Sequence, residues 1–493
     1  MRLDDLVSMS PDITLDGNLE CEISSLAMDS RKVEPGALFV ALRGVASDGH
    51  QFISQAIQKG AAAILINEDF QGSFPTDIAV IRAIDPRQTI ALLASRFYGN
   101  PSDKLHTIGV TGTNGKTTVT YMLQNILKPL GVPCGVIGTI GAHFFDTHFP
   151  TAATTPESIE LHQIFSKMVT AGIKVVAMEV SSHALMWHRV DGMRFDIAIF
   201  TNLSQDHLDF HESMERYMAA KSRLFRMPGH TDRPAAAILN IDDPASEYFR
   251  PMIPEYRTVR TYGLNRPADV TAKNVQEYPD SNTFDIVCSE GEFPTRVPIP
   301  GRHNILNVLA STAALIALGY DVASIASVLK ELPSIPGRME PIKQGQPFQV
   351  LVDYAHTPDA LINVLEAIRP ITQGRIITVF GCGGDRDKSK RPLMGSAAST
   401  RSDLTIVTSD NPRTENPTSI IDDIVPGLSK KNEYRIIPDR RTAIQMAIRI
   451  AKEGDTVLIA GKGHENYQII GDEKLVFDDR EESRKALELI GYK

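Results

Sequence analysis

Short apolar runs alternate with helix-length amphipathic segments along most of this chain. In the first hundred residues the runs that predict strands lie at 37–42, 62–66 and 79–84. In the middle of the chain they lie at 107–110, 134–140, 175–180, 197–200 and 235–239, and toward the end at 350–352, 376–380, 404–407, 434–437 and 457–460. Such an alternation is typical of parallel sheets covered by helices. The pattern therefore predicts an α/β protein whose middle part is a doubly wound sheet.

The length and the turn-rich breaks predict three domains. A chain of 493 residues exceeds the ~150 residues of a typical domain about threefold. The turn Gly99-Asn100-Pro101-Ser102 marks the first break. We expect an N-terminal α/β domain at 1–101, a central domain at 102–332 and a C-terminal Rossmann-like α/β domain at 333–493. Within the central domain, residues 283–298 predict a β-hairpin and 303–318 a closing helix.

The segment 106–121, HTIGVTGTNGKTTVTY, has the order strand, glycine-rich loop and helix. Glycines let backbone N–H groups surround phosphate oxygens, and the helix N-terminus adds partial positive charge. We expect Lys116 to neutralise phosphate and the Thr117 hydroxyl to hold Mg²⁺. Val110 stands where the general phosphate-loop pattern has glycine, and a plain glycine turn is the alternative. The candidate nucleotide-binding residues are Gly112, Thr113, Asn114, Gly115, Lys116, Thr117 and Thr118.

Polar residues gather where the predicted central strands end, as at the ligand-binding edge of parallel sheets. Glu179 follows the apolar run directly, and His207 lies in the loop TNLSQDHLD. A carboxylate beside a phosphate loop favours contact with Mg²⁺, although a lone glutamate after a strand is more often a solvated loop residue.

Lys221 falls on the apolar stripe of the helix predicted at 213–226. A buried ammonium is costly unless it is paired, modified or deprotonated. From the pattern alone, a lysine whose amine reaches water from the edge of the stripe is the better interpretation.

The predicted C-terminal strands end in polar loops at 353–358, 381–388, 409–413 and 461–465. This placement indicates one sheet face that serves a site. The basic cluster Arg386, Lys388, Lys390 and Arg391 follows a glycine loop and favours an anionic partner. In the first domain, loops at 28–31 and 44–50 are either ligand loops or ordinary turns.

Composition narrows the class of protein. The formal net charge of −9 argues against a nucleic-acid-coating surface. The N-terminus lacks the pattern of a signal peptide, and the apolar stretch 308–318 is too short to span a bilayer. The separated Cys21, Cys134, Cys288 and Cys382 are typical of free thiols in a reducing cytoplasm. We therefore expect a cytoplasmic protein without membrane insertion.

An ordered set of motifs resembles the Mur ligase family over nearly the whole chain, from Asp29 to Glu465. The motifs are TGTNGKTT, TTPE, MEVSSHAL, TNLSQDHLDFH, GRHN, PGRME, DYAHTPDAL, FGCGGDRDKSKRP, SDNPRTENP and AGKGHE. The resemblance implies an ATP-dependent amide ligase of peptidoglycan synthesis. It would add meso-diaminopimelate to UDP-N-acetylmuramoyl-L-alanyl-D-glutamate through an acyl phosphate.

The resemblance also implies roles for individual residues in catalysis and nucleotide binding. Lys116, Lys221, His207 and Glu179 would be catalytic. Two Mg²⁺ ions would be held by Thr117, Glu179, His207 and Lys221, the last as a carbamate formed with CO₂. Asn304 would contact adenine, and Arg338 and Asp353 the phosphate and ribose.

The implied substrate contacts come from all three domains. The uridine diphosphate end would meet Met28, Ser30, Val45, Ala46 and Ser47. The peptide end would meet Thr154, Thr155, Ser181, Trp187 and Arg189, although Ala153 and Trp187 depart from the best-known pattern. Diaminopimelate would be held by Arg386, Asp410, Asn411, Pro412, Arg413, Gly461 and Glu465. From pattern alone, Asp410-Asn411-Pro412-Arg413 would instead be a proline-stopped turn.

Three alternatives stay open at this point. They are the L-lysine-adding form, a related amide ligase of the folylpolyglutamate synthetase type, and a phosphate-loop switch that only hydrolyses nucleotide. The first domain and Arg413 weigh against the folylpolyglutamate type, because a guanidinium suits the additional carboxylate of diaminopimelate. We expect the chain to act as a monomer.

Overall fold

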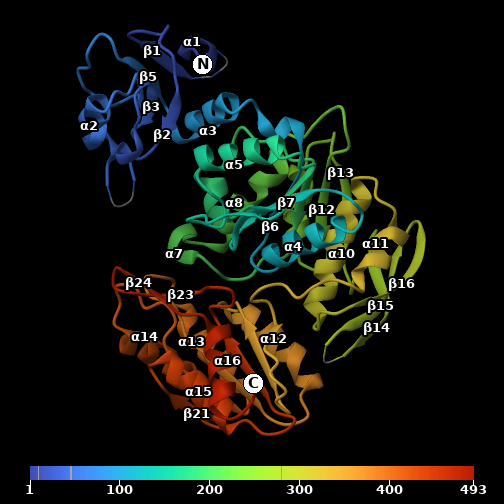
Figure 1. The fold of residues 1–493 in the computed structure, drawn as a ribbon. Coiled ribbons are helices and arrows are strands. Elements are labelled where there is room, and N and C mark those ends of the chain that lie inside the picture. Colours follow the sequence, from blue (N-terminus) through green and yellow to red (C-terminus); the bar gives the residue numbers. More distant parts are fainter. Residues whose placement is uncertain (9, 11, 45–46, 279) are drawn as a thin grey trace.

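Three large sheets, each built from a separate stretch of the chain, organise the protein (Figure 1). The computed structural model describes residues 1–8, 10, 12–44, 47–278 and 280–493. None of the helices within these residues is long and apolar enough to cross a membrane.

The first sheet has the strand order β1-β5-β4-β3-β2, in which only β1 runs antiparallel to its neighbour. Its strands are β1 (Ile13–Asp16), β2 (Ser25–Ala27), β3 (Ala37–Val40), β4 (Ala63–Asn67) and β5 (Ala79–Ala83). Its helices are α1 (Leu3–Val7), α2 (Ile53–Gln58) and α3 (Pro86–Phe97).

The central sheet has the order β13-β12-β11-β6-β10-β7-β8-β9, and the first six of these strands are parallel. They are β6 (His106–Thr111), β7 (Cys134–Gly138), β10 (Val175–Glu179), β11 (Ile197–Phe200), β12 (Ala236–Asn240) and β13 (Thr258–Tyr262). The antiparallel extension is β8 (Gly141–Phe144) and β9 (Thr147–Phe149). The nearby small sheet is β14 (Thr271–Glu277), β15 (Asn282–Cys288) and β16 (Gly291–Val297).

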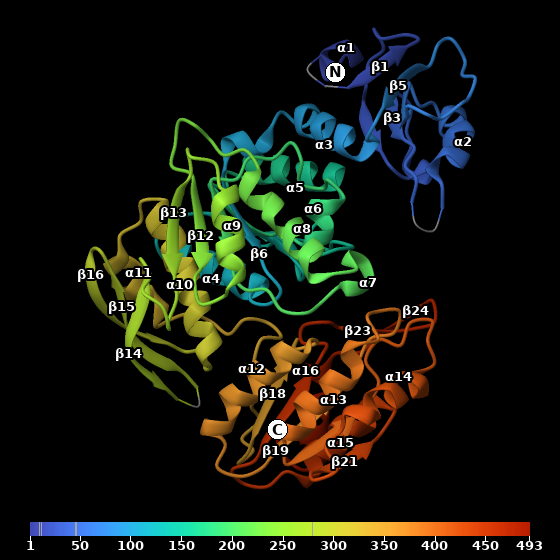
Figure 2. The same cartoon turned by 180° about the vertical axis from the view of Figure 1, so that it is seen from behind.

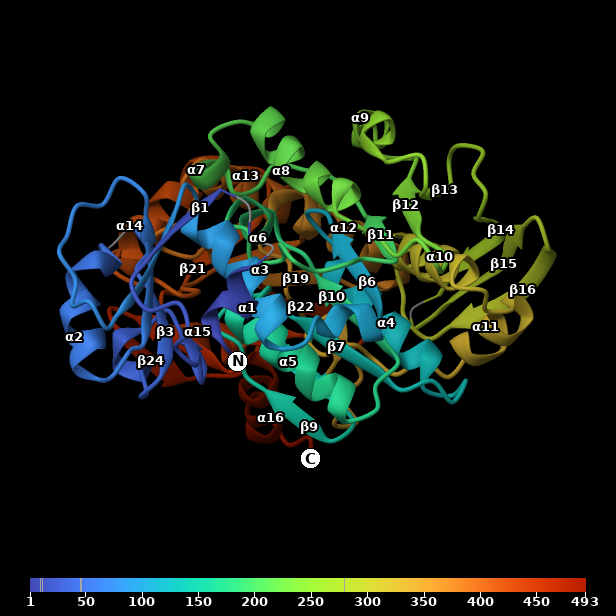
Figure 3. The ribbon, with the colours of Figure 1, turned by 90° about the horizontal axis from the view of Figure 1, so that it is seen from above.

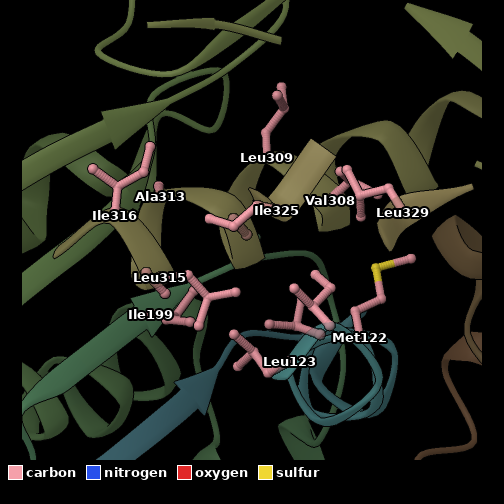
Figure 4. Packing of buried hydrophobic residues seen from close by; sticks show 14 of the residues in the cluster. Met122, Leu123, Ile199, Val308, Leu309, Ala313, Leu315, Ile316, Ile325 and Leu329 are labelled. Carbon is pink, nitrogen blue, oxygen red and sulfur yellow. The ribbon is translucent and has the colours of Figure 1, made fainter. Parts of the chain in front are cut away.

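Helices bury both faces of the central sheet. They are α4 (Lys116–Leu127), α5 (Ser158–Thr170), α6 (Ser182–Met186), α7 (Leu208–His211), α8 (Met214–Arg226), α9 (Ala245–Phe249), α10 (Arg302–Ala317) and α11 (Val322–Leu329). In β10, Val175 and Ala177 join the core with α4 and α10, whereas Val176 and Met178 join the core with α5 and α8. Figure 4 shows part of the first core, to which α4 contributes Met122 and Leu123 and α10 contributes Val308 and Leu315. Burial on both faces explains why the strands lack polar alternation.

The third sheet has the order β17-β18-β22-β19-β20-β21, and all of its strands except β17 are parallel. They are β17 (Glu340–Pro341), β18 (Gln349–Asp353), β19 (Ile376–Phe380), β20 (Leu404–Val407), β21 (Glu433–Ile436) and β22 (Thr456–Ala460). Its helices are α12 (Pro358–Ile368), α13 (Lys390–Arg401), α14 (Pro417–Ile424), α15 (Arg440–Ile450) and α16 (Asp479–Leu489). A separate hairpin pairs β23 (Tyr467–Ile470) with β24 (Glu473–Val476).

Each large sheet and its helices form one body of the molecule: the first body, the central body and the C-terminal body. The body with the first sheet meets the central one through α3 and α5. The C-terminal body, with α12 and α13, lies on the side of the central body where α7 lies (Figure 2). Seen from above, the first body and the sheet β14-β15-β16 lie at opposite ends of the central sheet (Figure 3).

The predicted fold class is confirmed, with local differences. The predicted hairpin at 283–298 is part of a three-stranded sheet, because β14 pairs along β15. The strands β8, β9, β23 and β24 are additions that the sequence pattern did not predict, since they are short and mostly edge-forming. The division at residues 101 and 332 stays a prediction.

The chain's single tryptophan lies where α3 meets the central body. The guanidinium carbon of Arg87 on α3 is 5.6 Å from the centre of the Trp187 ring, and that of Arg189 is 5.0 Å from it. Glu157 approaches both guanidinium groups, Arg189 at 2.6 Å and Arg87 at 4.0 Å. Cations stacked on an indole face are attracted by its electrons. The stack therefore joins the two bodies at the side of the predicted peptide contacts.

We expect Arg87→Ala to expose Trp187, giving a red-shifted emission maximum and faster quenching by acrylamide. The physical reason is loss of the guanidinium that covers the ring. Arg96→Ala is the matched control, because Arg96 lies on the same helix but donates to the carbonyls of Asp5 and Leu6. An unchanged spectrum in Arg87→Ala would contradict the stack.

Candidate functional site

The loop between β6 and α4 has the backbone of a phosphate loop. Gly112 has φ +148° and Gly115 has φ +87°. A Cβ on Gly112 would lie 1.9 Å from Thr201 Oγ1, so this position requires glycine. Lys116 Nζ donates to the carbonyls of Gly112 and Thr113 at 3.0 and 2.9 Å. Burial lowers the pKa of Lys116. The amine is thus held over the loop, where a phosphate would compete for it.

Glu179 is the last residue of β10 and lies against this loop. Parallel pairing sets Glu179 opposite Val110 of β6. Its Oε1 accepts hydrogen bonds from Thr117 Oγ1 at 2.9 Å and from the backbone N–H of Thr139 at 2.8 Å. Thr139 Oγ1 also donates to Oε2 at 3.1 Å. Glu179 is 1 % exposed, so the solvated-loop interpretation is not what the structure shows.

A cavity of about 570 Å³ opens between the central and C-terminal bodies. Many of the residues that we expect to bind nucleotide, metal or peptide line this cavity. They are Thr113, Asn114, Gly115, Lys116, Thr117, Thr118, Thr154, Glu179, Ser181, His207, Asn304, Arg338 and Asp353. They come from stretches more than two hundred residues apart in the sequence. Gly112, the first residue of the loop, is not among the residues that line the cavity.

The C-terminal body supplies one wall of this cavity. Arg338 Nη2 donates to Thr117 Oγ1 at 2.8 Å, across the boundary between the bodies. Asp353 accepts the N–H groups of Met339 and Ala355, both at 2.7 Å, and so shapes the loop that carries Arg338. On the opposite wall, Asn304 is buried at the start of α10 and donates to the carbonyl of Pro300 at 2.7 Å.

Lys221 is buried in the same region, 1 % exposed. Its Nζ donates to the carbonyl of Gly112 at 2.8 Å and lies 4.3 Å from the centre of the Tyr217 ring. Burial, and then the charge of Lys116, lower the pKa of Lys221 well below its ordinary value. The interpretation that the amine of Lys221 reaches water from the edge of the apolar stripe is therefore wrong. The amine lies beneath the phosphate loop in surroundings that disfavour the charged form.

His207 projects into the cavity from a left-handed position with φ +54°. Burial lowers the pKa of His207 to about 3, which outweighs the neighbouring Asp206 carboxylate at 3.3 Å. The imidazole is therefore neutral near pH 7 and able to bind a metal through nitrogen. Asp206 also reaches Lys390 of α13 at 3.6 Å, which links the two bodies.

The residues expected to hold metal supply hydroxyl, carboxylate and imidazole donors. Mg²⁺ favours oxygen ligands and commonly binds through one or two protein carboxylates together with phosphates and water. Among the described residues, no group of three or more His, Cys, Asp or Glu is arranged to hold an ion. Thr117 and Glu179 fit a magnesium ion that is shared with a triphosphate. His207 fits a second ion only if another anionic ligand joins it.

The expected peptide contacts surround the end of β10. Thr155 Oγ1 donates to the carbonyl of Glu179 at 2.8 Å, and Thr154 Oγ1 lies 3.2 Å from Thr139 Oγ1. Ser181 caps α6, and Arg189 donates to the carbonyl of Thr155 at 3.0 Å. Trp187 contacts Arg189 rather than lining the cavity.

The residues expected to bind the amino acid form a second cluster in the C-terminal body, outside the cavity lining. Arg413 Nη1 donates to the carbonyl of Gly384 at 2.7 Å, and Asn411 Nδ2 donates to Glu465 Oε2 at 2.8 Å. Burial lowers the pKa of Arg386, and Arg413 lowers it further while Asp209 of the central body opposes this. The cluster, which also contains Asp410, Pro412 and Gly461, therefore faces the central body near α7.

The residues expected at the uridine diphosphate end lie in the first body, away from the cavity. Ser30 is buried and donates to Gln55 Oε1 at 2.8 Å, Met28 is half-buried and Ser47 is exposed. Val45 and Ala46 lie outside the described residues.

Sequence reasoning missed several polar residues of the site. Thr139 binds both oxygens of Glu179, Asp359 accepts from Asn114 Nδ2 at 3.1 Å, and Lys462 pairs with Glu465 at 3.0 Å. Thr139 lies near the end of the strand predicted at 134–140, and Asp359 and Lys462 lie in the quoted motifs DYAHTPDAL and AGKGHE. Their position at a strand's carboxyl end was the signal that could have identified them.

Comparison with known proteins agrees with this arrangement. Three family models match the chain. The model described as "Mur ligase family, catalytic domain" matches residues 22–98, "Mur ligase middle domain" matches 110–315, and "Mur ligase, glutamate ligase domain" matches 337–463. A UDP-N-acetylmuramoyl-L-alanyl-D-glutamate–2,6-diaminopimelate ligase of Geobacillus thermodenitrificans is 44% identical over 491 residues, covering 99% of each chain.

Solved structures give the same result. One titled as a UDP-N-acetylmuramoyl-L-alanyl-D-glutamate–2,6-diaminopimelate ligase is 32% identical, with a TM-score of 0.71 and full coverage of both chains. A folylpolyglutamate synthase of Mycobacterium tuberculosis, complexed with ADP and AMPPCP, shares the fold at 16% identity and a TM-score of 0.63, over 81% of this chain and 94% of that one. On these matches, which extend over all three bodies, the chain belongs to the Mur ligase family.

Proposed function

We propose that this protein joins meso-diaminopimelate to UDP-N-acetylmuramoyl-L-alanyl-D-glutamate at the expense of ATP. The observation that carries the proposal is the cavity in which Lys116, Thr117, Glu179, His207 and Arg338 meet between two bodies. The full-length identity of 44% to a ligase of that name supports the choice of substrates. In the first step, the free D-glutamate carboxylate attacks the γ-phosphorus of ATP, giving an acyl phosphate and ADP. The amine then attacks the carbonyl carbon, and phosphate leaves.

The first step brings a carboxylate and a triphosphate together, so repulsion between anions is the main barrier. Lys116 and Arg338 supply cations on opposite sides of the phosphate loop. The N-terminus of α4 adds backbone N–H groups that are not used within the helix. Two bodies closing over the cavity would exclude water, which would otherwise hydrolyse the acyl phosphate.

Two Mg²⁺ sites complete the proposal. Thr117 and Glu179 would hold the first ion, and His207, Glu179 and a carbamate on Lys221 would hold the second. Bound there, the ions would neutralise the transferred phosphoryl group. The donor atoms and the neutral imidazole of His207 support this assignment.

The state of Lys221 supports the carbamate. A carbamate forms when an uncharged amine attacks CO₂, with loss of one proton and conversion of a potential cation into an anion. The lowered pKa of Lys221 favours the uncharged amine. Its position against the carbonyl of Gly112, close enough to His207 for its charge to lower the pKa of that imidazole, supports a carbamate near His207. The new carboxylate would be the missing anionic ligand of the second ion.

Recognition of diaminopimelate would use opposite charges in the second cluster. Arg413 and Arg386 would bind the distal carboxylate, and Glu465 the distal ammonium. The uridine diphosphate end would bind the first body at Met28, Ser30 and the loop 45–47. This recognition favours diaminopimelate over L-lysine, which has no carboxylate for the arginines.

The other functions are less well supported. The folylpolyglutamate synthase shares the fold, but it is 16% identical, whereas the diaminopimelate ligase is 44% identical. A nucleotide switch would leave the amino-acid cluster without a purpose. We further propose that the enzyme acts as a monomer in the cytoplasm, where its nucleotide-linked substrate would be made.

The decisive test is a phosphate-release assay with purified protein. We expect release only when ATP, the uridine-linked dipeptide and meso-diaminopimelate are all present. Lys116→Ala should lower the rate on the order of a thousandfold, because charge stabilisation of the transferred group is lost. Its far-UV circular dichroism should match the wild type. Release without an amino acid, or full activity of Lys116→Ala, would reject the proposal.

Lys221→Ala tests the carbamate. We expect activity to fall by about a hundredfold or more, with partial recovery on addition of formate or acetate, since a small carboxylate can occupy the space of the carbamate. Arg223→Ala on the same helix is the control, because its guanidinium contacts Asp191 and His188 instead. A fully active Lys221→Ala enzyme would remove the metal role.

Arg413→Ala tests the choice of amino acid. The wild type should prefer diaminopimelate to lysine strongly in kcat/KM, and the variant should lose about tenfold or more of that preference. Activity with lysine itself should change little. A variant that discriminates as well as the wild type would show that another residue reads the distal carboxylate.

A further inference from the structure

A buried lysine that the proposed reaction does not use lies in the loop after β22. Lys462 is 0 % exposed. Its Nζ donates to Glu465 Oε2 at 3.0 Å and to Asn411 Oδ1 at 3.1 Å, and it lies 5.4 Å from the centre of the Tyr467 ring. A buried ammonium is tolerated only when its partners satisfy it. Lys462 is therefore part of a built polar network.

Asn411 extends this network in two directions. Its Nδ2 donates to Glu465 Oε2 at 2.8 Å, so that one carboxylate oxygen accepts from both Asn411 and Lys462. Its Oδ1 accepts from Lys462 Nζ and, at 3.0 Å, from the backbone N–H of Ile469 in β23. Asn411 is itself 3 % exposed. The side chain thus ties the lysine to the hairpin as well as to Glu465.

The hairpin in turn sets the backbone of Arg413. Arg413 N donates to the carbonyl of Ile469 at 3.0 Å, and Gly471 N donates to the carbonyl of Arg413 at 2.7 Å. Arg413 has φ +52°, a conformation that a non-glycine residue keeps only when its surroundings enforce it. The contacts with β23 provide that enforcement.

We propose that Lys462 is a positioning residue for the amino-acid substrate, because it fixes Glu465 directly and the Arg413 loop through Asn411. This inference rests on the proposed function. The distal end of diaminopimelate has an ammonium and a carboxylate on one carbon, at a fixed separation. Glu465 and Arg413 recognise that pair only if their own separation is fixed.

The charge of Lys462 has a second effect on the cluster. Burial raises the pKa of Glu465; the charge of Lys462 opposes this rise, and the charge of Asp410 adds to it. Lys462 thus favours the carboxylate form of Glu465 and holds it through Oε2, so that Oε1 can face a substrate ammonium. Without Lys462, Glu465 would lose this charge and one of the two hydrogen bonds that fix its orientation.

Lys462→Met tests the proposal by the separation of KM from kcat. We expect the KM for meso-diaminopimelate to rise by about tenfold or more, equivalent to about 1.4 kcal/mol of binding. The KM values for ATP and the uridine-linked dipeptide should stay within about twofold, as should kcat at saturating diaminopimelate. Preference over lysine should fall in parallel. Equal changes in every parameter would overturn the proposal.

Lys474→Met is the matched control. Lys474 Nζ lies 3.7 Å from the centre of the same Tyr467 ring, but on the exposed strand β24. All kinetic constants of this variant should stay within about twofold of the wild type. A rise in the KM for diaminopimelate equal to that of Lys462→Met would show that the ring contact, rather than the buried network, matters.

If Lys462→Met does not fold, the double variant Lys462→Met/Glu465→Gln tests the proposal instead. It removes the charge of Glu465 together with that of Lys462, so that no unpaired carboxylate is left buried. Its KM for diaminopimelate should equal that of Glu465→Gln within about twofold, because Lys462 acts on the ammonium through Glu465. A further tenfold rise would overturn the proposal. Wild-type protein that does not use diaminopimelate at all would instead reject the proposed function.

Discussion

The parallel register of β6 with β10 is the constraint on which the site depends. It brings Glu179 opposite Val110, at the point where β6 enters the phosphate loop. Because strands of one parallel sheet end at one edge, Thr117, Thr139 and Glu179 meet although they come from three different segments. A shift of one residue would direct the carboxylate to the opposite face of the sheet and into an apolar core. The two apolar cores on either side of β10 make such a shift costly.

The second principle of the structure is the arrangement of buried charge. Lys116, Lys221 and Lys462 all have their amines within hydrogen-bonding distance of loop oxygens. Only Lys462 among them also has a carboxylate partner, Glu465. The amine of Lys221 rests on a backbone carbonyl and has a lowered pKa. The same residue type thus lies beside a carboxylate in one place and against a backbone carbonyl in another, so that its neighbours differ.

Contacts between the central and C-terminal bodies connect the two clusters. Arg338 reaches Thr117, Asp359 accepts from Asn114, and Lys390 reaches Asp206 beside His207. All three contacts are polar and pass through the cavity region, so bound nucleotide would compete with them or complete them. Such interfaces between domains commonly permit relative motion. These contacts therefore join the phosphate loop directly to the body that carries the second cluster.

Much of the fold could be predicted from the sequence. Strands that are buried on both faces appear in the sequence as continuous apolar runs, and these runs predicted β6, β11, β19 and β20 close to their observed bounds. The glycine-rich loop predicted the strand before it, β6, and the helix after it, α4. The strands β9, β13, β23 and β24 were missed, because each lies at a sheet edge or in an isolated hairpin, is partly exposed and leaves no continuous apolar run. The resemblance in motifs supplied the residue roles that periodicity could not, and those roles remain proposals.

By itself, the sequence determined the α/β class, the phosphate loop and the candidate residues, since these depend on local pattern and on residue chemistry. Only the tertiary structure decided that Lys221 lies buried beneath Gly112, that Glu179 is held by Thr117 and Thr139, and that Lys462 connects Glu465 to Asn411. The reason is physical. Burial and hydrogen-bond partners set the charge state of a group, and both come from residues that are distant in the chain.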